Sequence, residues 1–161
     1  MIKIKLSTLW LLMTITILVS CQRTLSTENI KPPGYQPPIS KDSMFRCHYL
    51  INWDSVSISN KLIGLWQWEF IECYWNPENA NSEDYKGLTV EFKTDKTVIV
   101  KDNGQVLQTS TWGITKLNDG YYKIDATPIV GQLFGKILFC DDRVVFSDTY
   151  VDGCDNYFKQ K

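Results

Sequence analysis

The stretch "GLTVEFKTDKTVIVKDNGQVLQTSTWGIT" (Gly87–Thr115) predicts three short strands joined by two turns. Leu88, Val90 and Phe92 alternate with polar residues, which is typical of a strand with one buried face. Asn103-Gly104 is a strong turn signal, because Asn-Gly tolerates the positive φ that tight hairpins need. This part of the chain therefore favours antiparallel hairpins.

The same alternation between turn residues continues on both sides of this stretch. No helical period of useful length follows Cys21, except for one turn in "WDSVSISNKL" (Trp53–Leu62). Many short strands with short connections predict an all-β fold, an antiparallel up-and-down eight-stranded barrel that leaves no open edge. The eight strand candidates are Leu62–Tyr74, Gly87–Lys93, Lys96–Asp102, Gln105–Thr115, Tyr121–Asp125, Gly135–Cys140, Arg143–Ser147 and Asp155–Gln160.

Residues 1–20 have the composition of a signal peptide. Lys3 and Lys5 precede an apolar run that is too short for a membrane span. The ending Leu18-Val19-Ser20-Cys21 resembles the lipobox of bacterial lipoproteins. That resemblance implies cleavage before Cys21 and acylation of its sulfur, so that the partner of Cys21 is a lipid bilayer. The alternative is an ordinary signal peptide that is cut elsewhere and leaves Cys21 as a thiol.

Residues 21–43 predict a lipidated cysteine followed by a flexible tether, because four of the six prolines and few large apolar residues lie there. Residues 44–161 then form a single domain by length. Without the signal peptide the chain carries 15 basic and 18 acidic residues, a formal charge of −3. Because this leaves no basic excess, we expect no nucleic-acid partner. We also expect the protein to be a monomer.

Four cysteines remain besides Cys21, and an even number in an exported chain indicates disulfides. A zinc site is the alternative, but no two cysteines have the short spacing that zinc sites use. The strand directions favour Cys73–Cys154, at neighbouring ends of the first and last strands, together with Cys47–Cys140. Pairing Cys140 with Cys154 would have to span a strand of roughly 17 Å. Three pairings are nevertheless open to four cysteines.

Three segments together resemble one family. "LIGLWQWEF" (Leu62–Phe70), the stretch from Gly87 to Ile114 and "DTYVDGCDNYFKQK" (Asp148–Lys161) look like the motifs of lipocalin-like proteins of the calycin superfamily, in particular the small lipoproteins of the Bacteroidota. The chain departs from a full lipocalin in being smaller and in lacking an obvious C-terminal helix. Because fold carries over more safely than function, the resemblance mainly implies a lipocalin-like barrel.

The resemblance also implies roles for the aromatic residues of "GLWQWEF" (Gly64–Phe70). Gly64 and Trp66 would plug the closed end of the barrel, and Trp68 and Phe70 would follow on the same inward face. The loop Tyr74–Gly87 would overhang the open mouth. The interior would be filled by a bulky set or would leave a pocket, for which the candidate lining residues are Trp68, Phe70, Phe92 and Tyr122. The full inward set would be Trp66, Trp68, Phe70, Val90, Phe92, Val98, Val100, Trp112, Ile114, Tyr122, Ile124, Ile137, Phe139, Val144 and Phe146.

Signs of catalysis are weak. His48 is the only histidine, and we expect a loop histidine beside a disulfide rather than a general base. Asp148, Asp152 and Asp155 predict an aspartate-capped turn rather than a calcium site. We therefore expect no catalytic residues, no cofactor and no metal.

The first functional expectation is a non-catalytic, membrane-anchored binding protein of the bacterial envelope, with a small apolar molecule as its ligand. The alternative is an inhibitor of an envelope hydrolase, or an accessory protein, that acts through its loops and has a packed core. Gln22, which follows Cys21, resembles an outer-membrane address, so the expected location is the outer membrane facing the periplasm.

Overall fold

The computed structural model describes residues 39–75 and 83–161. The expected signal peptide, Cys21 and most of the expected tether lie outside these residues. The prediction of an all-β, eight-stranded antiparallel barrel is confirmed. Its strands are β1 (Gly64–Cys73), β2 (Leu88–Phe92), β3 (Thr97–Asp102), β4 (Gln105–Lys116), β5 (Tyr122–Thr127), β6 (Lys136–Cys140), β7 (Arg143–Ser147) and β8 (Cys154–Gln160).

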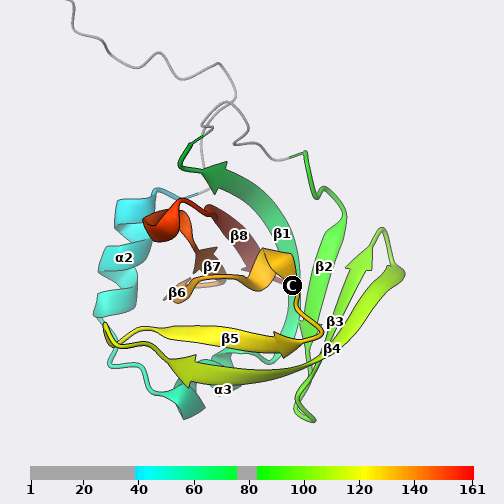
Figure 1. Cartoon of the computed structure of the whole chain (residues 1–161), viewed down its shortest axis with the longest axis horizontal. Coiled ribbons are helices and arrows are strands. Elements are labelled where there is room, and N and C mark those ends of the chain that lie inside the picture. Colours follow the sequence, from blue (N-terminus) through cyan, green and yellow to red (C-terminus); the bar gives the residue numbers. More distant parts are fainter. Residues whose placement is uncertain (1–38, 76–82) are drawn as a thin grey trace, which may run out of the picture. The chain divides into compact units, whose positions relative to one another are not determined.

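The strands follow the order β5-β4-β3-β2-β1-β8-β7-β6 in one sheet that curls into a ring (Figure 1). The first and last strands, β1 and β8, are neighbours, as an up-and-down barrel requires. The described strands form no hydrogen-bonded ladder between β5 and β6. The expectation of a barrel without an open edge is therefore wrong at this one seam, where the backbone groups of both strands need other partners.

The helix α2 (Lys41–Tyr49) packs on the outside of the barrel, and the sequence did not predict it. It begins inside the expected tether, where the Ser40 side chain accepts the N–H of Ser43 as an N-cap. Met44, on the buried face of α2, is fully buried. Met44 and its neighbours form an outer core, which we define as Met44, Phe70, Leu138, Cys140, Val145 and Tyr157.

The helix α3 (Ser55–Leu62) covers the end of the barrel at which β1 begins. Asp54 caps it by accepting the N–H of Ser57 at 2.7 Å. Ile58 and Leu62 are fully buried in the barrel core. The turn expected in Trp53–Leu62 is thus a complete short helix. No helix within residues 39–75 and 83–161 is both long enough and apolar enough to cross a bilayer.

A β-bulge changes the direction of the aromatic stripe in β1. Trp68 pairs with Phe158 and Phe70 pairs with Tyr157, so Glu69 is an extra residue on β1. Trp66 and Trp68 point into the barrel, whereas Phe70 lies in the outer core under α2. The expectation that Phe70 faces inward is therefore wrong, because the bulge shifts the two-residue alternation by one position.

The other positions expected to face inward do belong to the barrel core. Most are almost completely buried, and Ile114 packs against them while partly exposed. They are Trp66, Trp68, Val90, Phe92, Val98, Val100, Trp112, Ile114, Tyr122, Ile124, Ile137, Phe139, Val144 and Phe146.

Two disulfides connect distant parts of the domain, in the pairing that the strand directions favoured. Cys73–Cys154 joins the end of β1 to the start of β8, across 81 residues of sequence. Cys47–Cys140 joins α2 to the end of β6, across 93 residues. The second bridge fixes the outer helix beside the seam.

Candidate functional site

The largest cavity that we describe lies at the end of the barrel where β1 ends and β8 begins, which we call the mouth. Its volume is about 330 Å³. Two short 3-10 helices border it, η2 (Gly131–Leu133) and the region of η3 (Thr149–Val151). The lining residues are Ile71, Trp75, Tyr85, Gly131, Gln132, Phe134, Asp148, Gly153, Cys154 and Asn156.

Three aromatic rings line this mouth cavity. Trp75 and Phe134 are 60% and 51% exposed, which is unusual for such large apolar side chains. Tyr85 packs edge-to-face on Trp68, with ring centroids 5.4 Å apart. Trp75 and Tyr85 come from the connection between β1 and β2, and Phe134 comes from the connection between β5 and β6. The barrel scaffold therefore brings these two distant segments together.

Asn156 contributes a polar group whose orientation is fixed. The indole N–H of Trp68 donates to Asn156 Oδ1 at 3.2 Å. Because an indole nitrogen can only donate, Oδ1 must be the atom that faces Trp68. The amide nitrogen of Asn156, a buried residue that lines the cavity, has no hydrogen bond to any described residue.

Asp155 holds the turn that carries Asp148. The fully buried Asp155 carboxylate accepts the backbone N–H groups of Asp148 and Thr149 at 2.9 and 3.1 Å. Lys41 Nζ of α2 lies 3.0 Å from the same carboxylate. Of the aspartates expected to cap this turn, Asp155 does so, because its carboxylate accepts two backbone N–H groups of the turn.

Asp148 itself lines the mouth cavity, and its carboxylate has no hydrogen bond to a described residue. Gly153 makes room for it, since a Cβ on Gly153 would lie 2.2 Å from Asp148 Oδ2. Partial burial, and then the neighbouring Asp155 carboxylate, raise the pKa of Asp148 above its usual value. The cavity therefore contains a carboxylate that a cation would stabilise.

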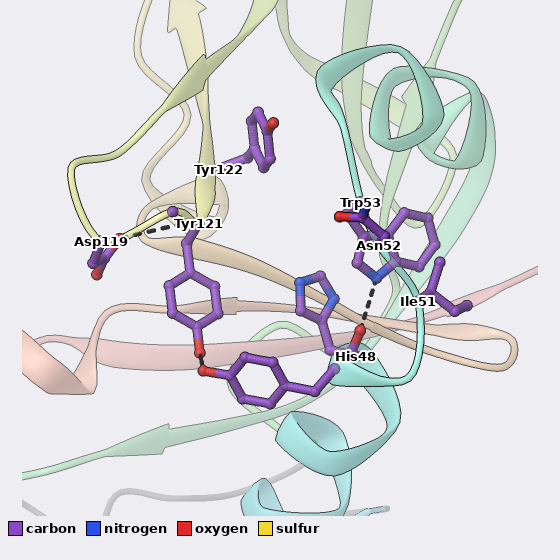
Figure 2. A pocket seen from close by; sticks show the side chains of 9 residues that line it. His48, Ile51, Asn52, Trp53, Asp119, Tyr121 and Tyr122 are labelled. Atoms are coloured by element: carbon purple, nitrogen blue, oxygen red, sulfur yellow. Dashed lines mark hydrogen bonds between the residues drawn. The ribbon is translucent and has the colours of Figure 1, made fainter.

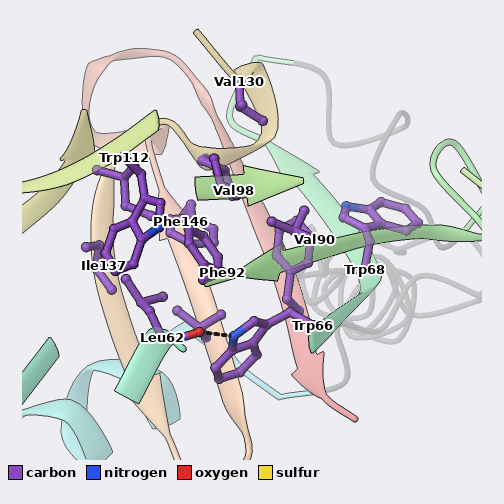
Figure 3. Packing of buried hydrophobic residues seen from close by; sticks show 14 of the residues in the cluster. Leu62, Trp66, Trp68, Val90, Phe92, Val98, Trp112, Val130, Ile137 and Phe146 are labelled. Atoms are coloured by element: carbon purple, nitrogen blue, oxygen red, sulfur yellow. Dashed lines mark hydrogen bonds between the residues drawn. The ribbon is translucent and has the colours of Figure 1, made fainter. Parts of the chain in front are cut away.

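The barrel interior away from the mouth is densely packed (Figure 3). Trp66 is fully buried, and its indole N–H donates to the carbonyl of Leu62 in α3 at 2.6 Å. The ring of Phe92 meets Trp112 edge-to-face at 5.2 Å. Gly64 begins β1 with a φ of +129°, a conformation that favours glycine, whereas its nearest neighbour leaves space for a Cβ. Gly64 and Trp66 thus lie at the end of the barrel that α3 covers.

A second cavity, of about 230 Å³, lies between the end of α2 and the turn before β5 (Figure 2). His48 stacks between Trp53 and Tyr121, with ring centroids 5.5 and 6.1 Å away. The hydroxyls of Tyr49 and Tyr121 share a hydrogen bond at its edge. Asp119 and Tyr122 complete the polar side of this cavity.

His48 has a structural role in this arrangement. It belongs to α2 rather than to a loop, and its Nδ1 accepts the backbone N–H of Phe139 at 3.1 Å. Burial lowers the pKa of His48 to about 4, so the imidazole is neutral near neutral pH. No serine, threonine or cysteine lines this cavity among the described residues, so no nucleophile of those types accompanies the histidine.

In the described part of the chain, one group of side chains has its potential metal-ligand atoms within 4.8 Å of one another, namely Cys47, Cys140 and Asp141. The two sulfur atoms are bonded to each other in the disulfide, so neither is a thiolate that could bind a metal.

The four residues predicted to form a ligand pocket do not line one cavity. Trp68, Phe92 and Tyr122 belong to the barrel core, whereas Phe70 lies in the outer core. Of the four, Tyr122 also lines the cavity at His48. The mouth cavity uses none of them.

Sequence reasoning missed the residues that line the mouth. The one available signal was the presence of three aromatics, Tyr74, Trp75 and Tyr85, in the largely polar loop Tyr74–Gly87, and two of them line the cavity. Asp148 and Asn156 gave no signal, because each looked like an ordinary turn or strand residue.

Comparison of the chain with protein-family models, with curated proteins and with solved structures gave no match, so the resemblance to lipocalin-like proteins rests on the sequence motifs alone and stays a prediction.

Proposed function

We propose that this protein is a non-catalytic binding protein that holds a small, largely apolar molecule at the mouth of its barrel. The observation that carries the proposal is the mouth cavity of about 330 Å³, where Trp75, Tyr85 and Phe134 line a space at the end of a rigid sheet. Ligand pockets commonly begin near 300 Å³ and combine apolar walls with a few polar groups.

The proposed ligand lies at the mouth and not deep in the barrel. Trp66, Phe92 and Phe146 are essentially inaccessible to solvent and pack against their neighbours. Opening this core would sacrifice aromatic contacts that stabilise the fold. A ligand of the size of one or two rings fits this arrangement better than a long lipid chain does.

The proposal includes a lipid anchor at Cys21, because the segment Leu18–Cys21 has the lipobox pattern. Acyl chains on Cys21 would attach the barrel to the envelope, at the outer membrane facing the periplasm. The two disulfides support an oxidising compartment such as the periplasm.

The test is binding of a neutral apolar probe, N-phenyl-1-naphthylamine, followed by its fluorescence with the full chain. We expect Phe134→Ala to weaken probe binding about tenfold, because half of this ring is already exposed and its loss leaves the fold intact. Val106→Ala is the matched control, an exposed apolar residue outside the cavity. Absence of probe binding, or equal loss in both variants, would contradict the proposal.

A second candidate function is inhibition of an envelope hydrolase, and the packed barrel core favours it. In that case the exposed rings Tyr74, Trp75 and Phe134 would contact a protein surface, since large aromatics commonly anchor interfaces. The test is inhibition of a purified lysozyme by the full chain, with Trp75→Ala as the variant expected to relieve it. Inhibition without binding of the naphthylamine probe would favour this function over ligand binding.

A further inference from the structure

We propose that the mouth cavity selects ligands that carry an ammonium group next to an apolar ring, and that Asp148 is the residue that pairs with the ammonium. This inference rests on the proposed function, because it names the chemical class that the same cavity takes. It concerns a recognition site that combines one carboxylate, three aromatic rings and a fixed amide.

The first argument for a cationic ligand is the charge of the cavity lining. Asp148 is the only charged side chain among the described residues that line the cavity. The other polar lining side chains, Gln132, Tyr85 and Asn156, are neutral. Among the described lining residues, a ligand cation therefore meets one anion and no lysine or arginine, whereas a ligand anion is repelled by Asp148.

The second step is that Asp148 is available. The nearby Lys41 is paired with the buried Asp155 carboxylate at 3.0 Å. Asp155 also accepts the two backbone N–H groups of the turn, while no described side chain bonds to Asp148. Asp155 therefore stabilises the turn, whereas the carboxylate of Asp148 remains available to a ligand in the cavity.

The third step is the aromatic lining. Trp75, Tyr85 and Phe134 line the same cavity as Asp148. Aromatic faces attract cations, and a partly desolvated site strengthens this attraction. The raised pKa of Asp148 agrees with this, because it marks a carboxylate whose charge is poorly solvated and has a like charge beside it.

The experiment uses three probes with the same phenyl ring and different head groups, titrated into the full chain by NMR or calorimetry. They are 2-phenylethylamine, 2-phenylethanol and 3-phenylpropionate. We expect the amine to bind about tenfold more tightly than the alcohol, and the carboxylate to bind most weakly.

Asp148→Asn is the informative variant, because it removes the charge and keeps the shape beside Gly153. It should weaken 2-phenylethylamine binding to the level of 2-phenylethanol and leave the alcohol unchanged. Asp152→Asn is the control: this exposed acid lies in the same turn, outside the cavity lining, and its left-handed φ of 62° suits asparagine. The control should keep the preference for the amine.

The outcomes separate this inference from the proposed function. Equal affinity for all three probes, unchanged in Asp148→Asn, would overturn the role of Asp148 and leave apolar ligand binding intact. No binding of any probe at about 10 mM, a concentration well above the millimolar range of weak complexes, would contradict both. A preference for the amine that Asp152→Asn abolishes and Asp148→Asn preserves would also overturn the assignment.

Discussion

The imidazole Nδ1 of His48 accepts the backbone N–H of Phe139 at 3.1 Å and so connects α2 to the unpaired edge of β6. The same imidazole stacks on Tyr121, which directly precedes β5. One side chain therefore contacts both sides of the seam that the sheet leaves without a ladder. A protonated imidazole has no acceptor atom, so this contact requires neutral His48.

We predict that the protein loses stability in mild acid because of this residue. The pKa of His48 is about 4 in the folded protein and 6.5 when unperturbed, so the unfolded chain binds a proton first. The free energy of unfolding should then fall as the pH decreases from 6.5 towards 4, and should not depend on His48 outside that window. We expect a loss of roughly 1 kcal/mol between about pH 7.5 and pH 5.5, measured by urea unfolding.

His48→Asn is the control for this pH dependence, because the asparagine Oδ1 can accept the same N–H and does not titrate. The chain has a single histidine, so little else titrates between pH 7.5 and 5.5. The groups around the imidazole are the rings of Tyr49, Trp53 and Tyr121, with Asp119 in the same cavity. If His48→Asn retained the full pH dependence of the free energy of unfolding, another titrating group would be responsible for it.

Phe70→Ala should destabilise the protein without affecting the mouth. Phe70 is buried in the outer core and meets Tyr157 edge-to-face at 5.8 Å. Its truncation should reduce the free energy of unfolding by about 3–5 kcal/mol, as for other buried phenylalanines. Binding of N-phenyl-1-naphthylamine should stay unchanged under conditions where the variant is folded. Weaker probe binding in the folded variant would contradict this and would show that Phe70 contributes to the ligand site.

The two disulfides should contribute similarly to stability, because they close loops of similar length. Their sequence separations of 93 and 81 residues correspond to about 4–5 kcal/mol each on the chain-entropy model. Denaturant unfolding of the double variants Cys47→Ser/Cys140→Ser and Cys73→Ser/Cys154→Ser measures each contribution. Peptide mapping without reduction checks the pairing, and a Cys47–Cys73 linkage would contradict it.

Cys21→Ser should release the protein from the membrane fraction if the lipobox assignment is right. The wild-type chain should incorporate radiolabelled palmitate in a bacterial host, and the variant should not. Cys47→Ser/Cys140→Ser serves as a control, because those sulfurs are already bonded to each other. Labelling that persists in Cys21→Ser would show that the lipobox pattern is misleading.

The strands could be predicted from the sequence because they depend on local rules. Alternation in Leu88–Phe92 and the turn at Asn103-Gly104 are properties of neighbouring residues, and both appear in the structure. The disulfide pairing followed from strand direction alone, once eight strands were assumed.

The features that sequence reasoning missed depend on contacts between distant segments. The bulge at Glu69 is defined by pairing with β8 and has no signature within β1 itself. The helix α2 has only Met44 and His48 buried, so its apolar face is too narrow to give a clear helical period. The mouth cavity combines Trp75, Phe134 and Asp148 from three connections, and only the closed barrel brings them together.

The position of β8 has a consequence for the order in which the barrel is built. β8 is the last of the eight strands to leave the ribosome, yet it pairs with β1 on one side and with β7 on the other. Until it arrives, β1 and β7 both expose hydrogen-bonding edges, and Cys73 at the end of β1 has no Cys154 to pair with. Such edges invite association with other chains. We therefore expect the nascent chain to depend on chaperones until β8 has been synthesised, and the barrel to form in one late step.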